Sequence, residues 1–123
     1  MQQQNGVMRA SWICLTLVSV GITGFGLVVI AAPPSGGDSL LYRADGLASV
    51  GLGVFGLLLA VIPLRRRERW AWSALWFYPV FWLAHLLFGL PPGTDHVHQV
   101  VFIVLSLTGL LLPVRLFFPR GTR

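Results

Sequence analysis

Three histidines and an aspartate lie within fourteen residues of an otherwise apolar segment, FWLAHLLFGLPPGTDHVHQVVFIV (81–104). His85 lies among Trp, Leu and Phe residues, whereas Asp95, His96 and His98 follow a Pro-Pro-Gly break. Imidazole and carboxylate groups bind Zn, Cu or Fe, and two facing histidines can ligate a haem. A neutral histidine near a carboxylate can instead relay protons or sense pH. The alternative is that these residues form only the polar mouth, or outer end, of a pair of membrane helices and bind no ligand.

Further candidates share the helical face or the membrane level of these residues. Tyr78 and Trp82 precede His85 by seven and three positions, so one helix presents all three on one face. The candidate ligand-binding set is Asp45, Tyr78, Trp82, His85, Asp95, His96 and His98. A quinone, a lipid, a haem or a divalent metal would suit such a set. In the alternative interpretation the aspartates cap the helices that follow them, and only the histidine below the interface, His85, calls for a functional explanation.

The elements that must position these residues are four apolar stretches. The 123 residues are 55% hydrophobic and 11% charged, less than half of the quarter that is usual in soluble domains. Each stretch has roughly 20 residues, enough to cross a hydrocarbon core of about 30 Å as a helix. We therefore predict an all-α integral membrane four-helix bundle, one transmembrane domain over 1–123, with spans at Trp12–Ala31, Gly46–Leu64, Trp70–Leu90 and Val97–Phe118.

The arginines predict how the chain is threaded. All nine basic residues are Arg, and an even number of spans places eight of them on one side, leaving Arg43 on the other. The positive-inside rule then puts both termini in the cytoplasm, an N-in/C-in multi-pass protein of the cell membrane. A basic rim facing anionic lipid explains the charge better than a nucleic-acid partner. Residues 1–31 resemble a cleavable signal, but the apolar run is longer than usual and Pro33 crowds the cleavage site, which favours a retained span.

Small residues predict how the helices pack. Gly46, Ser49, Gly53, Gly56 and Ala60 are spaced 3, 4, 3 and 4 apart, which puts them on one face of the second span. Small residues let membrane helices approach closely, so we expect a packing seam here, and self-association through this glycine-rich helix is one use for it. Pro79, near the centre of the third span, is expected to kink that helix.

No phosphate-binding glycine loop, nucleophile elbow or zinc-protease motif is present, so catalysis has no recognisable centre. The stretches RRRERWAWSALWFYPVFWLAHLLFG and DHVHQVVFIVLSLTGLLLPVRLFFP resemble small bacterial four-helix membrane proteins that are loosely DoxX-like. The resemblance implies a partner protein or a quinone, because some DoxX-type proteins are accessory subunits of quinone-linked oxidoreductases. We expect a non-enzymatic subunit or scaffold, as a homo-oligomer or within a larger membrane complex. The alternative is a small-molecule site at the outer mouth, formed by Asp45, His85 and His98. A redox-linked ligand such as a quinone is one candidate for this site.

Overall fold

The computed structural model describes residues 2–89 and 96–119, and these residues are helical with no strand among them. The helices are α1 (Gln2–Ala31), α2 (Ser39–Val61), α3 (Arg69–Leu75), α4 (Phe77–Phe88), α5 (Val97–Leu111) and α6 (Val114–Phe117). Four stretches are long and apolar enough to cross a membrane: Gln2–Ala31, Ser39–Leu64, Arg69–Phe88 and Val97–Phe117. The all-α architecture with four candidate membrane spans is therefore confirmed.

Two helices begin earlier than the apolar stretches that predicted them. Helix α1 starts at Gln2 instead of Trp12, and α2 starts at Ser39 instead of Gly46. In α2 the helix starts after its capping residue, whereas the predicted boundary followed hydrophobicity. Asp38 caps α2, because its carboxylate accepts hydrogen bonds from the backbone N–H of Leu40, at 2.9 Å, and of Leu41, at 3.4 Å. The prediction that Asp45 caps this helix is wrong, since Asp45 lies inside α2 and is exposed.

Prolines divide two of the spans. The third span breaks at Trp76, between α3 and α4, three residues before Pro79. Pro79 has no N–H to donate to the carbonyl of Leu75, and its ring crowds that carbonyl, so the helix is interrupted there. Pro113 separates α5 from α6 in the same way and leaves the carbonyl of Gly109 without its usual helical donor. The hydroxyl of Ser11 in α1 donates to that Gly109 carbonyl at 2.5 Å.

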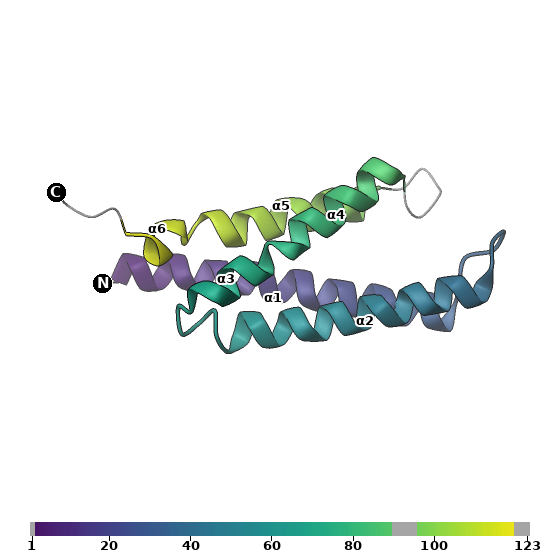
Figure 1. The fold of residues 1–123 in the computed structure, drawn as a ribbon, viewed down its shortest axis with the longest axis horizontal. Helices are drawn as coiled ribbons and strands as arrows, with labels where there is room; N and C mark the ends of the chain where they lie inside the picture. Colours follow the sequence, from purple (N-terminus) through teal and green to yellow (C-terminus); the bar gives the residue numbers. More distant parts are fainter. Residues whose placement is uncertain (1, 90–95, 120–123) are drawn as a thin grey trace.

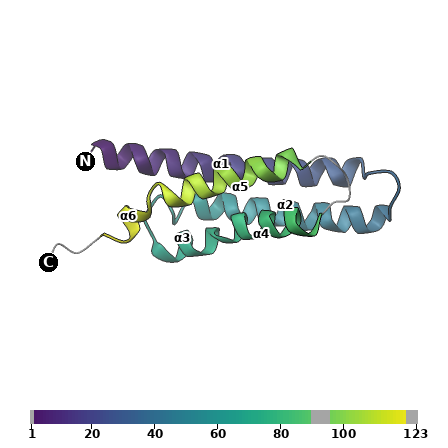
Figure 2. The same cartoon turned by 90° about the horizontal axis from the view of Figure 1, so that it is seen from above.

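The helices form a bundle in which α1 is central. Figure 1 shows α1 and α2 as an antiparallel hairpin, with α4 and α5 lying along one another beside it. Figure 2 shows the same bundle from above, with the N-terminus and α6 at one end and the α1–α2 connection at the other. Helix α1 packs on α2 and on α5, and α5 packs on α4. The α1 side chains Leu15, Val18 and Ile22 are fully buried at the centre of the core.

The five small residues of α2 are all buried: Gly46, Ser49, Gly53, Gly56 and Ala60. At the tightest crossing, a Cβ added to Gly46 would come within 2.8 Å of the Gly26 carbonyl oxygen of α1. A Cβ added to Gly26 would come within 2.5 Å of the Gly46 carbonyl oxygen. The two backbones touch directly, which only glycine allows. Because this face is used within the chain, an oligomer would need another face of α2.

Candidate functional site

The histidine end of the bundle is built around the indole of Trp82 on α4, which is 2% exposed. The Trp82 ring centroid lies 5.5 Å from that of His85 and 5.9 Å from that of His98 on α5. Phe102, one turn further along α5, lies 4.9 Å from the same indole. The two imidazoles that were predicted to converge therefore both pack on one tryptophan ring.

His85 is half-buried and turned along its own helix. Its Nδ1 hydrogen-bonds with the carbonyl oxygen of Phe81 at 3.0 Å, one turn earlier in α4. Its ring also packs on the Phe81 ring, with centroids 4.1 Å apart. Both contacts are local, so α4 alone orients this imidazole. One ring nitrogen is engaged by the backbone, which leaves Nε2 as the atom with which His85 would bind a ligand.

His98 on α5 is held by aromatic contacts with another helix. Its ring stacks on Phe25 of α1, with centroids 5.2 Å apart and planes 20° apart. The same ring meets Phe102 edge-on at 6.5 Å. Sequence reasoning did not single out Phe25, because one phenylalanine in an apolar span carries no signal for a contact with a different helix. The imidazole of His98 thus joins α1, α4 and α5.

Of the remaining predicted site residues, the structure describes His96, Asp45 and Tyr78, each in surroundings of its own. His96 is the N-cap residue of α5, and its Nδ1 hydrogen-bonds with Gln99 Oε1 at 3.1 Å. Asp45 is exposed on α2, next to the glycine that packs on α1. Asp95 lies outside the described residues. Within 2–89 and 96–119 no three His, Cys, Asp or Glu side chains come close enough together to hold a metal ion.

Tyr78 belongs to a different polar contact, deeper in the bundle. Seven residues before His85, it lies about 10 Å further along the helix axis. Its hydroxyl forms a hydrogen bond of 2.7 Å with Ser19 Oγ of α1 and donates to the Leu52 carbonyl of α2 at 3.3 Å. Ser19 Oγ also lies 2.8 Å from the Leu15 carbonyl oxygen, and because each hydroxyl has one proton, two of these three contacts are hydrogen bonds at any one time. The phenol therefore ties α4 to α1 and α2 where the ring lies against Gly56.

An apolar groove of about 190 Å³ lies beside this contact, between α2 and the third span. Gly56 and Tyr78 line it, and the exposed rings of Phe55 and Phe77 flank it. The aromatic side chains of the third span differ in their surroundings. Trp82 is buried, Phe77 is 52% exposed, and Tyr78 borders the groove.

A polar cavity at the opposite end of the bundle was not foreseen as a site. Its lining residues come from the start of α1 and from the α2–α3 connection, and Arg9, Arg65 and Arg67 are among them. The arginines were read from the sequence as a topology signal and as a basic rim facing anionic lipid, but not as a cavity, because residues 9 and 65 are far apart in the chain. Comparison with protein-family models, with curated proteins and with solved structures finds no match to this chain. The DoxX-like resemblance accordingly stays a prediction.

Proposed function

We propose that this chain is a non-enzymatic integral membrane subunit or scaffold. The observation that carries the proposal is how the polar groups inside the bundle are used. The hydroxyls of Ser11, Ser19 and Tyr78 link helices to one another. The Trp72 indole N–H, on α3, likewise donates to the carbonyl of Leu110 near the end of α5, at 2.9 Å. These side chains contribute to holding the helices together, which is the role expected in a subunit or scaffold.

The exposed apolar surface supports a role in lipid or in an assembly. Large side chains such as Leu47, Phe55 and Phe88 are 67%, 72% and 78% exposed. Lipid covers such a surface in a monomer, and other subunits cover part of it in a complex. Since the small-residue face of α2 is buried against α1, partners would bind the outward faces. Whether those partners are copies of this chain or other proteins is decided by the mass measurement described below.

The proposed location is the bacterial cell membrane, with both termini in the cytoplasm. The support is the arginine distribution: among the described residues, six arginines belong to the end that holds the N-terminus and the α2–α3 connection, and Arg43 lies near the other end. Labelling of single cysteines in intact cells with a membrane-impermeant maleimide tests it, in a Cys14→Ser background. Ser35→Cys, in the exposed α1–α2 connection, should react, and Gln4→Cys should react only after the membrane is permeabilised. The opposite pattern would refute the orientation.

A small-molecule site around Trp82 is the second candidate function. Its Nε1–H is buried and has no hydrogen-bond acceptor among the described residues. A buried donor without a partner is costly, and a ligand carbonyl oxygen would satisfy it. A quinone has such oxygens and a flat ring that suits the aromatic side chains of Phe81, His85 and Phe102 around this indole.

Native mass spectrometry of the full chain, extracted from membranes in a mild detergent, distinguishes the two functions. The subunit or scaffold predicts a stoichiometric mass made of protein chains, unchanged in His85→Ala. A ligand site predicts an added small-molecule mass that His85→Ala and Trp82→Phe both remove. His96→Ala is the matched control, because that imidazole contacts Gln99 and not Trp82. A bare monomer under these conditions would count against both functions.

A further inference from the structure

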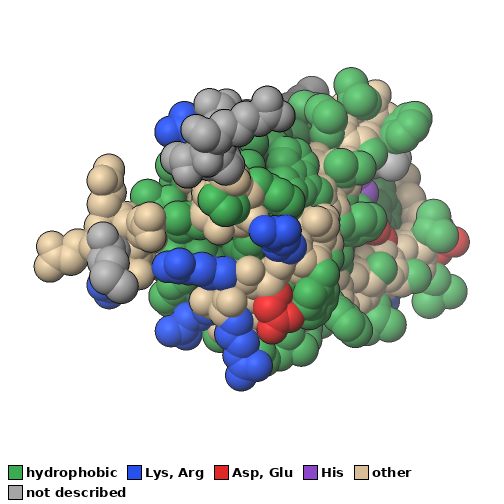
Figure 3. Space-filling view, turned by 60° about the vertical axis from the view of Figure 1, so that its left-hand side comes forward, with side chains coloured by type: hydrophobic (Ala, Val, Ile, Leu, Met, Phe, Trp, Pro, Cys, Tyr) green, Lys and Arg blue, Asp and Glu red, His purple; other side chains and the backbone are tan. Residues whose placement is uncertain are grey.

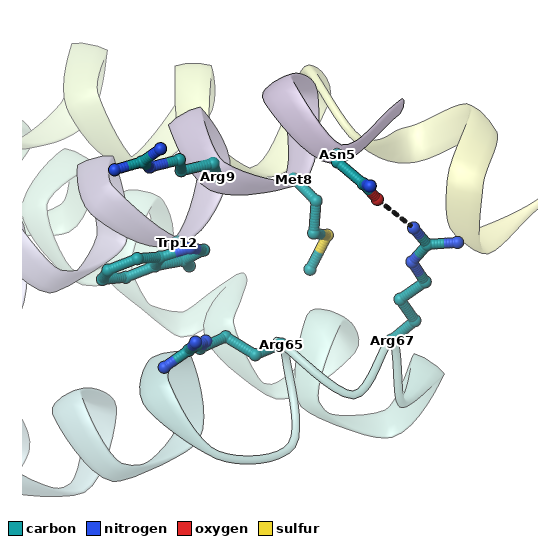
Figure 4. A pocket seen from close by; sticks show the side chains of 6 residues that line it. All are labelled: Asn5, Met8, Arg9, Trp12, Arg65 and Arg67. Carbon is teal, nitrogen blue, oxygen red and sulfur yellow. Dashed lines mark hydrogen bonds between the residues drawn. The ribbon is translucent and has the colours of Figure 1, made fainter. Parts of the chain in front are cut away.

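A cavity of about 370 Å³ lies at the arginine end of the bundle. Figure 3 looks toward this end and shows several arginine side chains gathered on it. Figure 4 shows the six residues that line the cavity, four from α1 and two from the α2–α3 connection: Asn5, Met8, Arg9, Trp12, Arg65 and Arg67. The volume is within the range of small-molecule sites. Neither of the functions proposed above uses this cavity.

The cavity is strongly basic, because Arg65 and Arg67 contact uncharged groups there. The guanidinium carbon of Arg65 lies 4.9 Å from the centroid of the Trp12 ring. The guanidinium of Arg67 donates from Nη2 to Asn5 Oδ1 at 3.4 Å. Indole and amide are both uncharged, so neither neutralises its arginine. Glu68, the acidic residue of this connection, accepts instead from the indole N–H of Trp70.

The backbone holds Arg67 in an unfavourable conformation. Its φ is 61°, in the left-handed region, where glycine is normally found. The N–H of Glu68 donates to the Pro63 carbonyl at 3.0 Å, and that of Arg67 donates to the Leu64 carbonyl at 2.9 Å. These two bonds form a Schellman motif, with Arg67 at the position that favours glycine. Non-glycine residues in such conformations concentrate at functional sites, and here the residue supplies a charge to the cavity.

The cavity also has an apolar side, formed by Met8 and Trp12. Met8 is 6% exposed, and Figure 4 shows it between the Arg65–Trp12 pair and the Arg67–Asn5 pair. Trp12 opens the apolar run of α1, where tryptophan marks the membrane interface. The forked guanidinium of arginine matches the oxygens of a phosphate, and basic pockets between membrane helices bind phosphate-bearing headgroups.

We propose that Arg9, Arg65 and Arg67 form a binding site for a phosphate group at the membrane surface. The phosphate is carried by an anionic phospholipid or by a soluble phosphate, and the guanidiniums recognise both by the same hydrogen bonds. The site requires only that the four spans lie in a membrane. It does not depend on the scaffold role or on a ligand at Trp82.

Native mass spectrometry of the full chain with added lipid tests the site. The probes are phosphatidylglycerol, which is anionic, and phosphatidylcholine, whose choline cation the arginines repel. We expect one phosphatidylglycerol to bind about tenfold or more tighter than phosphatidylcholine. Arg65→Gln and Arg67→Gly should each weaken phosphatidylglycerol binding about tenfold, the typical effect of losing a hydrogen bond to a charged group.

The matched control is Arg115→Gln, which removes an exposed arginine that does not line the cavity. It should change the affinity less than about twofold. Arg67→Gly also guards against misfolding, because glycine suits that backbone position and should keep the thermal midpoint at or above that of the wild type. Equal losses in Arg115→Gln and Arg67→Gly, or equal binding of the two lipids, would overturn the proposal.

Inorganic phosphate distinguishes the two sources of the phosphate group. If millimolar phosphate displaces phosphatidylglycerol from the wild type, and Arg65→Gln abolishes that competition, the site serves soluble phosphates. If the wild type keeps phosphatidylglycerol bound in millimolar phosphate, and the arginine variants lose the lipid, the site serves lipid headgroups. Both results support a phosphate site. Absence of binding by phosphatidylglycerol and by phosphate would refute it.

Discussion

Replacing Gly56 with alanine would place a methyl group where the phenol of Tyr78 lies. A Cβ built on Gly56 overlaps the Tyr78 hydroxyl oxygen and comes within 2.8 Å of a ring carbon, Cε2. The ring is 2% exposed, and its hydroxyl is held by Ser19 Oγ and the Leu52 carbonyl. Tyr78 therefore cannot make room for the methyl group without leaving a packed position and losing these hydrogen bonds.

The expected loss follows from the two parts of that displacement. Overpacking a well-packed core costs about 1–3 kcal/mol. An interhelical hydrogen bond in a membrane protein contributes about 0.6 kcal/mol, and Tyr78 makes two. Because alanine favours the helix by about 1 kcal/mol, Gly56→Ala should lower the free energy of unfolding by about 1–3 kcal/mol in total. SDS titration in mixed micelles, followed by tryptophan fluorescence, measures this free energy.

Gly51 on the same helix supplies the matched control, because nothing lies within 4 Å of a Cβ added there. Gly51→Ala should stay within about 1 kcal/mol of the wild type, on the stabilising side, since alanine favours the helix. In the double variant Gly56→Ala/Tyr78→Phe the atom nearest the new methyl is gone, so the loss should be smaller than the sum of the single losses. A Gly56→Ala protein as stable as the wild type, or a Gly51→Ala protein equally destabilised, would refute the reasoning.

Three further predictions concern the breaks and links between helices. Pro79→Ala restores an N–H that can donate to the Leu75 carbonyl, so α3 and α4 should merge, and the distance between spin labels on the two helices should increase in pulsed EPR; an unchanged distance would contradict this. Ser11→Ala removes the donor to the Gly109 carbonyl and should cost about 0.6–1.7 kcal/mol in SDS unfolding, whereas no measurable loss would mean that the bond contributes nothing. Arg67→Gly should raise the free energy of unfolding by about 1 kcal/mol, seen as a higher thermal midpoint, and a lower midpoint would show that the left-handed turn is not strained.

The sequence determined those features that depend on local periodicity and hydrophobic length. Four apolar stretches predicted four helices able to cross a membrane, because a span needs only enough apolar residues in a row. The 3, 4, 3, 4 spacing from Gly46 to Ala60 identified the residues of α2 that are buried, because the helical period alone puts them on one face. The break in the third span follows from Pro79, whose missing N–H acts within one turn.

Only the tertiary structure decided which faces of different helices meet. The histidines at 85 and 98 both pack on the Trp82 indole, and His98 also stacks on Phe25 of α1. Asp45 was expected to cap α2 but lies exposed inside that helix, because Asp38 is the residue that caps it. The basic cavity likewise depends on how closely the α2–α3 connection approaches α1. Such contacts between distant segments depend on helix ends, crossings and packing, and none of these is encoded in the spacing of residues along one helix.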